Sequence, residues 1–210
     1  MSTTTNRAFY YSPGSRYSYL ALSQVPDLEA TLGVMFDWVP VIGARIRAIR
    51  GVDPFAGPPQ SGQYDWDYRR RDAEAWADLY GIEFIEPASH VIDSHMLGRG
   101  AVVASHMGCV RDYSWALAVQ VYGSGTWPID EAVVIGVAEQ LGINTAEFTE
   151  HLRDPASAAE IEANCQKAVA EGVFGTPTLL IDDELFWGND RLPLVRHHLR
   201  KMAEARTTQG

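Results

Sequence analysis

Two hydroxyl side chains stand three residues apart in the segment Ser15-Arg16-Tyr17-Ser18, at the expected start of a helix. A β-prone run, Ala8-Phe9-Tyr10-Tyr11, and a Ser12-Pro13-Gly14 turn precede them. Unpaired backbone N–H groups and the helix dipole at such a position favour negative charge. A serine does not ionise near neutral pH, but its hydroxyl can donate a hydrogen bond to a thiolate that a ligand brings. Ser15 is therefore the candidate catalytic residue, with a simple helix cap as the alternative.

A second candidate segment, Gly172-Val173-Phe174-Gly175-Thr176-Pro177-Thr178, precedes a short apolar run. Its glycines and its place before a β-hairpin favour a cis Thr176-Pro177 bond, whereas most such bonds are trans. A cis-proline leaves the N–H and C=O of the preceding residue free to pair with an extended peptide. We therefore expect Thr176 and Pro177 to bind a peptide-like ligand within contact distance of Ser15.

A third candidate, the pair Asn189-Asp190, follows Gly188 at the start of the last expected helix. Asn and Asp suit both a turn and a helix cap, which is the structural interpretation. The functional alternative is a cradle, in which backbone N–H groups bind a carboxylate and Asp190 binds an ammonium.

The elements that position these residues follow the order βαβ, then a block of helices, then ββα. The residues Asp182-Asp183 form the expected hairpin turn, and the region from Gly51 to Gln63 is a loop by composition. Helical periodicity in the central block predicts helices that stop at Gly81 and at Gly142. Strands are predicted at 8–11, 34–39, 178–181 and 184–187.

A strand, a tight turn and a helix carrying two reactive residues three apart is the setting of a thioredoxin-type Cys-x-x-Cys. Here hydroxyls replace both thiols, so the sequence predicts an α/β thioredoxin-like fold without dithiol redox chemistry. The missing cysteines nearly exclude a dithiol oxidoreductase. The thioredoxin-like domain takes residues of about 7–50 and about 172–206, and a helical insertion of about 65–170 interrupts it.

The chain has 210 residues and a formal net charge of −10. This charge argues against a nucleic-acid or anionic-membrane surface as a partner, because both are negative. No apolar run reaches the length of a membrane span, and residues 1–6 lack the basic and apolar stretches of a signal peptide. We therefore expect a cytoplasmic protein.

The two cysteines, Cys109 and Cys165, lie far apart in segments with helical patterning. We expect them to be reduced, to pack as small buried hydrophobic residues and to be dispensable for activity. The histidines do not fall into a zinc-ligand spacing with either cysteine, so no metal site is predicted.

Three segments resemble the kappa-class glutathione transferases, and among these the bacterial 2-hydroxychromene-2-carboxylate isomerases. The segments are Phe9 to Leu20, Gly172 to Thr178 and Phe186 to Leu192, and the resemblance extends over about residues 7–200. It implies a DsbA-like thioredoxin fold with a helical insertion, a homodimer and glutathione as cofactor.

The same resemblance implies roles for individual residues. Ser15 would contact the glutathione sulfur, and Thr176, beside Pro177, would pair with the cysteinyl backbone. Asn189 and Asp190 would hold the γ-glutamyl end of the tripeptide.

The sequence departs from the family pattern at four positions of this implied site. Arg16 stands where the family has a proline after the serine. Asp65 replaces a common lysine, Asp93 replaces an asparagine, and Asp53 lies in a loop whose asparagine helps to bind glutathione. Acidic replacements repel an anionic tripeptide, so the cofactor is glutathione or another low-molecular-weight thiol. Arg16 either adds a compensating positive charge or is simply solvated.

The predicted activity is a thiol-dependent isomerisation of a small aromatic substrate of the 2-hydroxychromene-2-carboxylate type. Arg16 and Tyr17 are the expected substrate contacts, and Asp53 belongs to the expected cofactor loop. Reversible addition of a thiolate turns a conjugated double bond into a single bond, which allows rotation before the alkene is restored. The alternatives are a glutathione S-transferase-like conjugating enzyme and a non-catalytic thioredoxin-like protein that binds a peptide or partner at Pro177.

Overall fold

The computed structural model describes residues 6–51, 65–87, 92–125 and 127–208. The elements follow one another as β1 (Arg7–Tyr11), α1 (Arg16–Leu32), β2 (Asp37–Pro40), α2 (Gly43–Arg50), α3 (Trp66–Tyr80), α4 (Ser94–His106), α5 (Val110–Ala118), η2 (Val119–Gly123), α6 (Glu131–Gln140), α7 (Thr145–Arg153), α8 (Pro155–Ala170), β3 (Thr178–Ile181), β4 (Glu184–Trp187), η3 (Asn189–Arg191) and α9 (Leu192–Thr208).

The described strands form one mixed sheet in the order β2-β1-β3-β4. Strand β1 pairs with β2 in parallel, and α1 is the crossover that joins them. Strand β3 pairs antiparallel with β1 and with β4, so β3 and β4 form a hairpin. Its turn includes Asp182 at a φ of 53°, a conformation that Asp tolerates better than most residues. The predicted βαβ and ββα units, and the hairpin bounds, are confirmed.

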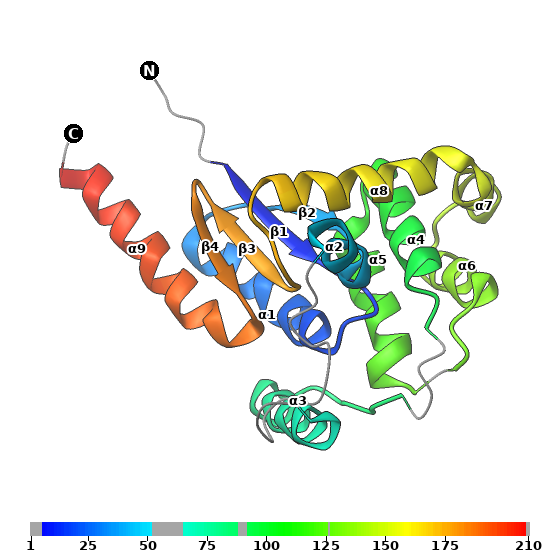
Figure 1. Ribbon diagram of the computed structural model, residues 1–210, viewed down its shortest axis with the longest axis horizontal. Helices are drawn as coiled ribbons and strands as arrows, with labels where there is room; N and C mark the ends of the chain where they lie inside the picture. Colours follow the sequence, from blue (N-terminus) through cyan, green and yellow to red (C-terminus); the bar gives the residue numbers. More distant parts are fainter. Residues whose placement is uncertain (1–5, 52–64, 88–91, 126, 209–210) are drawn as a thin grey trace.

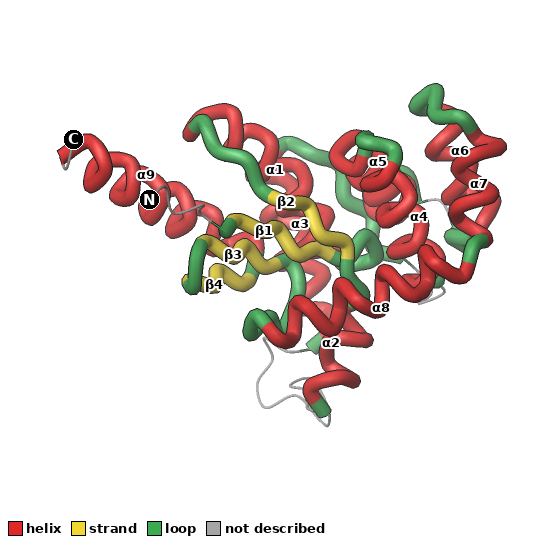
Figure 2. The backbone as a smooth tube through the Cα atoms, turned by 90° about the horizontal axis from the view of Figure 1, so that it is seen from above, coloured by secondary structure: helices red, strands yellow, loops and turns green. Residues whose placement is uncertain are grey.

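Side chains alternate along β1 and therefore face two different layers. Phe9 and Tyr11 belong to the larger core, which α1, α4, α5 and α9 complete. Ala8 and Tyr10 belong to a second core, which α2 and α8 complete. Figure 2 shows α1 on one side of the sheet and α2 with α8 on the other.

The remaining helices extend the molecule beyond the two edges of the sheet. Helices α4 to α7 gather beyond β2, whereas α9 runs beside β4 (Figure 1). Helix α3 packs on α1 through a small core of Leu20, Ala73 and Ala77. The side chains that the sequence places inward on the last helix do face the core: Leu192, Val195 and Leu199 are buried, and Met202 packs against them.

Three expectations about local structure are wrong or incomplete. The second strand begins at Asp37 rather than at residue 34, because the Phe36 N–H donates to Glu29 Oε1 at 2.7 Å instead of pairing with β1. The spacing of Val134, Val137, Ala138 and Leu141 predicts one buried helix face, but Leu141 is 40% exposed where α6 ends. The sequence analysis above also assigns no helix to residues 43–50, although Ile42, Ile46 and Ile49 have the spacing of one helical face and pack in the second core.

Buried Glu29 connects the end of α1 to the edge strand and to α5. Its carboxylate is 3% exposed and accepts hydrogen bonds from the Phe36 N–H, from Trp38 Nε1 at 3.4 Å and from both Nη atoms of Arg111 at 2.7 and 3.0 Å. Arg111 Nη2 also donates to the Phe36 carbonyl. These bonds fix the start of β2 and hence the register of the sheet edge.

No helix in the described ranges is both long and apolar enough to span a bilayer.

Helices α3 to α8 lie between β2 and β3 in the sequence. The division of the chain into a thioredoxin-like domain and a helical insertion stays a prediction.

Candidate active site

The pairing of the strands brings the candidate segments to one end of the sheet. Tyr10 lies opposite Thr178, so the turn after β1 and the segment before β3 leave the sheet at the same end. Thr178 in turn lies opposite Trp187, which brings the residues after β4 to that end as well. In the parallel pair, Tyr11 lies opposite Pro40, just before α2. The segments that meet there are 12–15, 41–43, 176–177 and 188–190.

Ser15 is the N-cap of α1 and is half-buried. Its backbone is extended, with φ −106° and ψ 127°, and its Oγ accepts the Ser18 N–H at 3.4 Å, which is a long hydrogen bond. Within the part of the chain that the structure describes, the hydroxyl proton of Ser15 is donated to no group. The cap interpretation is therefore confirmed, and the cap leaves the proton available to a ligand.

The turn that carries Ser15 is fixed from several sides. Ser18 is buried, and its Oγ accepts the Ser12 N–H at 3.1 Å, so Ser18 has the structural role of a helix-start residue. The Tyr122 hydroxyl donates to the Gly14 carbonyl at 2.8 Å. A Cβ at Gly14 would lie 3.1 Å from Ile92, which shows how closely the start of α4 approaches this turn. The position of the Ser15 hydroxyl is thus determined by tertiary contacts.

The Thr176-Pro177 bond is cis, as the sequence predicts. The Pro177 carbonyl accepts the Gly188 N–H at 2.9 Å, which anchors the proline to the segment after β4. The N–H and C=O of Thr176 form no hydrogen bond with the described residues. A Cβ at Gly43 would lie 3.4 Å from Thr176 Oγ1, so the N-terminus of α2 lies beside this backbone. Contact between this segment and Ser15 through one ligand stays a prediction.

Asn189 and Asp190 lie on the short helix η3, with Asn189 buried and Asp190 exposed. Asn189 Nδ2 has no hydrogen-bond partner in the described residues, although the Tyr80 phenol of α3 lies close to it. Burial raises the pKa of Tyr80, the neighbouring Asn189 side chain opposes that shift, and the Asp190 carboxylate adds to it. Asp190 forms an ion pair with Arg191 at 3.2 Å. The site therefore has a buried amide donor, next to the Tyr80 phenol, beside an exposed carboxylate.

Arg16 is buried, so its interpretation as a solvated residue is wrong. Its Nη2 forms an ion pair with Glu86 Oε1 at 2.8 Å, and its guanidinium carbon lies 4.3 Å from the centroid of a Trp66 ring. Sequence reasoning misses both partners, because neither lies near Arg16 in the chain and no periodicity links them. Arg16, which directly follows the candidate catalytic serine, therefore has its positive charge paired with the Glu86 carboxylate.

Tyr17 is half-buried, and its hydroxyl donates to Asp72 Oδ2 of α3 at 2.9 Å. Burial and this hydrogen bond raise the pKa of Tyr17 to about 12, so the phenol is neutral near pH 7. The guanidinium of Arg69 lies 5.8 Å from the Tyr17 ring. Tyr17 thus holds α3 against the first turn of α1, and its contact with a substrate stays a prediction.

The acidic residues that replace the family pattern cap helices. Asp65 is the N-cap of α3 and accepts the Tyr68 N–H at 2.6 Å. Asp93 is the N-cap of α4 and accepts two backbone N–H groups of the first turn, both at 3.0 Å. Each carboxylate is partly neutralised by its own helix, which weakens the argument against glutathione drawn from these residues. Asp53 lies outside the described residues.

Two surface grooves lie on other parts of the described chain. One, of about 480 Å³, follows the outer edge of β2, and the other, of about 340 Å³, lies between α1, α3 and α9. Neither is lined by Ser15, Thr176 or Asn189. The second groove includes Tyr80 and so adjoins the Asn189 side of the site.

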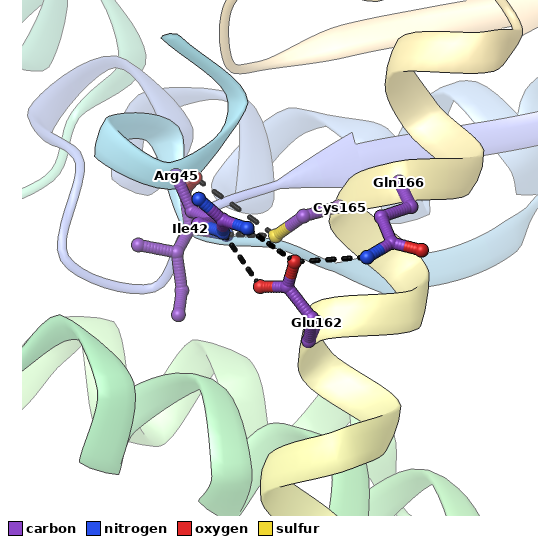
Figure 3. Close-up of polar contacts among 5 residues, drawn as sticks. All are labelled: Ile42, Arg45, Glu162, Cys165 and Gln166. Atoms are coloured by element: carbon purple, nitrogen blue, oxygen red, sulfur yellow. Dashed lines mark hydrogen bonds and ion pairs between the residues drawn. The ribbon is translucent and has the colours of Figure 1, made fainter. Parts of the chain in front are cut away.

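Both cysteines are free, and Cys165 is fully buried on α8. Figure 3 shows its sulfur facing Ile42, the N-cap of α2, whose N–H donates to Sγ at 3.3 Å. Beside it, Arg45 donates to both carboxylate oxygens of Glu162 at 2.6 and 2.7 Å, and this lowers the pKa of Glu162 to about 2. The charges of this cluster satisfy one another, so it fastens α2 to α8.

Cys109 differs from the sequence-based expectation, because it is half-buried and lies in the turn between α4 and α5 as the N-cap of α5. Burial raises its pKa, and the nearby Asp112 adds to the shift. Burial likewise raises the pKa of Cys165. Both thiols therefore carry less thiolate near neutral pH than an exposed cysteine does.

We expect a thiol reagent such as 5,5′-dithiobis(2-nitrobenzoate) at pH 8 to modify Cys109 slowly, and Cys165 only after denaturation. A Cys109→Ser, Cys165→Ser variant should keep its turnover, because a serine hydroxyl at position 165 can still accept the Ile42 N–H. Fast modification of two thiols in the native chain, or loss of turnover in a folded double variant, would contradict this prediction.

The amino-acid sequence of this chain is similar to known proteins over most of its length. Residues 8–200 match the family described as a DSBA-like thioredoxin domain. A 2-hydroxychromene-2-carboxylate isomerase of Pseudomonas putida is 30% identical over 195 residues, which cover 92% of this chain and 94% of that protein. One of Sphingobium xenophagum is 28% identical over 191 residues, which cover 91% of this chain and 96% of that protein.

A solved structure of 2-hydroxychromene-2-carboxylate isomerase has the same fold. It superposes with a TM-score of 0.85 at 26% identity, and the match covers 97% of this chain and 98% of that chain. The sequence and structure matches therefore both extend over nearly the whole chain, including the segments that meet at the end of the sheet. The chain belongs to the DSBA-like thioredoxin domain family and, within it, to the family of 2-hydroxychromene-2-carboxylate isomerases.

Proposed function

We propose that this isomerase acts on a 2-hydroxychromene-2-carboxylate-type aromatic substrate with a low-molecular-weight thiol as cofactor, glutathione being the first candidate. The observation that carries the proposal is the Ser15 hydroxyl, which caps α1 and donates its proton to no described residue. The helix N-terminus at this point favours a negative charge. A thiolate sulfur can accept the hydrogen bond of the Ser15 hydroxyl, and its negative charge is favoured by the helix N-terminus.

The residues at this end of the sheet fit a thiol that carries a peptide backbone. Thr176 offers an N–H and a C=O that no described residue uses, which suits the cysteinyl unit of such a ligand. Asn189 offers a buried amide that makes no hydrogen bond of normal geometry with the described residues, and Asp190 offers an exposed carboxylate for an ammonium. A buried polar group without a partner is unfavourable in the chain alone, so a ligand that satisfies it gains affinity.

A bound thiol supplies a nucleophile that adds reversibly to a conjugated double bond and so permits rotation about it. Ser15 lowers the pKa of that thiol by donating a hydrogen bond to its charged form. The first turn of α1 adds the favourable dipole, and Thr176 sets the position of the sulfur through the backbone. No proton has to be taken up by Ser15, because its hydroxyl acts as a donor throughout.

Glutathione conjugation and non-catalytic peptide binding remain the alternative activities, and Arg16, Tyr17 and Asp53 remain predicted ligand contacts. The homodimer and the cytoplasmic location stay predictions as well.

The first experiment measures the isomerisation of 2-hydroxychromene-2-carboxylate by its absorbance change. It is run without thiol and then with glutathione, with cysteine or with N-acetylcysteine. We expect turnover only with thiol, fastest with glutathione. Equal rates without thiol would remove the cofactor from the proposal.

The same preparation separates the alternatives. Conjugation is measured with 1-chloro-2,4-dinitrobenzene and glutathione, and we expect it to be much slower than isomerisation. Glutathione binding without turnover of either compound would instead favour the binding protein.

A further inference from the structure

Arg16 differs from the other arginines with described ion pairs in its burial. Its side chain is 6% exposed, whereas those of the others are 33% to 65% exposed. Nη2 of Arg16 forms the described ion pair with Glu86, and Nη1 is buried without a hydrogen-bond partner in the described residues. A guanidinium offers five N–H donors in a planar fork, so one carboxylate oxygen does not exhaust it. The chain therefore holds a buried cationic donor directly after Ser15.

The described neighbours of Arg16 contact its guanidinium at the Nη2 atom and on the face of its plane. Glu86 holds the guanidinium at its Nη2 side, at 2.8 Å. Trp66 covers the guanidinium plane at 4.3 Å, and this indole is itself 49% exposed at the surface. The guanidinium of Arg69 lies 5.6 Å from the same indole. Tyr17 and Tyr122 are neutral, since burial raises the pKa of each phenol.

We propose that Nη1 of Arg16 receives the carboxylate of the aromatic substrate, that Glu86 is the positioning residue of the guanidinium, and that Trp66 is its movable cover. The inference rests on the proposed function, because it names the group that orients the substrate beside the thiol. Arginine binds carboxylates through parallel, charge-assisted hydrogen bonds, and a planar aromatic ring can take the place of the indole on its face. The side chain next to Ser15 then selects a substrate that has both a carboxylate and a conjugated ring.

The assignment gives a reason why Glu86 pairs with Nη2 of Arg16 while Nη1 has no hydrogen-bond partner in the described residues. Burial lowers the pKa of Arg16, and Glu86 opposes that shift, so the ion pair keeps the guanidinium charged in a desolvated place. Glu86 also repels a second carboxylate, which limits the affinity for the substrate. A weaker ground-state attraction is compatible with turnover, because tight binding of the substrate alone does not raise the rate.

The test compares two probes that differ only in charge, trans-cinnamate and trans-cinnamamide, by isothermal titration calorimetry without thiol. We expect the wild-type chain to bind cinnamate about tenfold to a hundredfold more tightly, which is the range for a hydrogen bond to a charged group. Arg16→Met should abolish this preference and Arg16→Lys should keep part of it. The matched control is Arg153→Met, whose arginine pairs with Glu131 at the surface and should leave the preference unchanged.

Two further variants test the other roles and do not depend on a folded Arg16→Met chain. Glu86→Gln keeps an acceptor for Nη2 but removes the negative charge, so the preference for cinnamate should increase. Trp66→Ala should keep or strengthen cinnamate binding, because no cover has to be displaced. Equal affinity of the wild type for both probes would overturn the proposal, as would an unchanged preference in Arg16→Met or loss of cinnamate binding in Trp66→Ala. Intact cinnamate preference without thiol-dependent turnover would instead refute the proposed function alone.

Discussion

Ser15→Ala is expected to lower thiol-dependent turnover by about tenfold to a thousandfold, the range for losing one hydrogen-bond donor to a developing or resident negative charge. The hydroxyl is the donor, and no described residue accepts its proton, so its removal leaves the thiolate without this partner. The apparent pKa of the thiol should rise, since the charged form loses stabilisation. The rate of the variant should therefore be lowest relative to wild type near neutral pH, and it should recover in part as the pH is raised.

The stability of this variant should change little. The Ser15 cap bond is 3.4 Å long, and the loss of an N-cap destabilises a protein by about 1 kcal/mol. The matched control is Ser23→Ala on the same helix, whose hydroxyl donates to the Leu20 carbonyl at 2.7 Å and lies away from the helix start. The measurements are kcat, KM for thiol and the pH profile of both variants. Wild-type rates for Ser15→Ala at saturating thiol would exclude Ser15 from the mechanism.

Glu29→Ala is expected to be strongly destabilising, with a loss of about 3 kcal/mol. The variant leaves the Phe36 N–H, Trp38 Nε1 and Arg111 without the acceptor that they share. The value is at the lower end of the range for breaking a buried ion pair, because the Arg111 side chain is 35% exposed and can be hydrated. A loss of this size corresponds to a fall in Tm of about 6 to 12 °C for a chain of this length.

The matched control is Glu74→Ala, which removes the surface ion pair with Arg70. That pair is 2.7 Å long, and its side chains are 41% and 45% exposed, so its loss should change the free energy of unfolding by less than about 0.5 kcal/mol. Urea denaturation of both variants measures the difference. Equal stability of the two would show that the Glu29 cluster does not hold the edge of the sheet. Glu29→Gln should lie between wild type and Glu29→Ala, because the amide keeps one acceptor.

Local signals in the sequence were sufficient for much of the fold. The hairpin, the turn at Asp182 and the helix cap at Ser15 each depend on residues within a few positions of one another. The serines at positions 15 and 18, where a Cys-x-x-Cys would have its thiols, nearly exclude dithiol chemistry for the same reason. Helix α2 was not predicted, because it is only eight residues long and the helical spacing of Ile46 and Ile49 covers a single turn.

The tertiary structure decided which partners surround the candidate site. Asp65 and Asp93 looked like charges that face a ligand, but each accepts backbone N–H groups of its own helix. The sequence left open whether Arg16 is solvated, and the structure shows it buried beside Glu86 and Trp66, which lie far along the chain. Pattern and spacing describe one element at a time, whereas the burial and charge of a side chain depend on the elements that pack against it. The sequence by itself therefore determined the frame and named Ser15 as a candidate, and only the packing of α3 and the segment after it revealed the environment of Arg16.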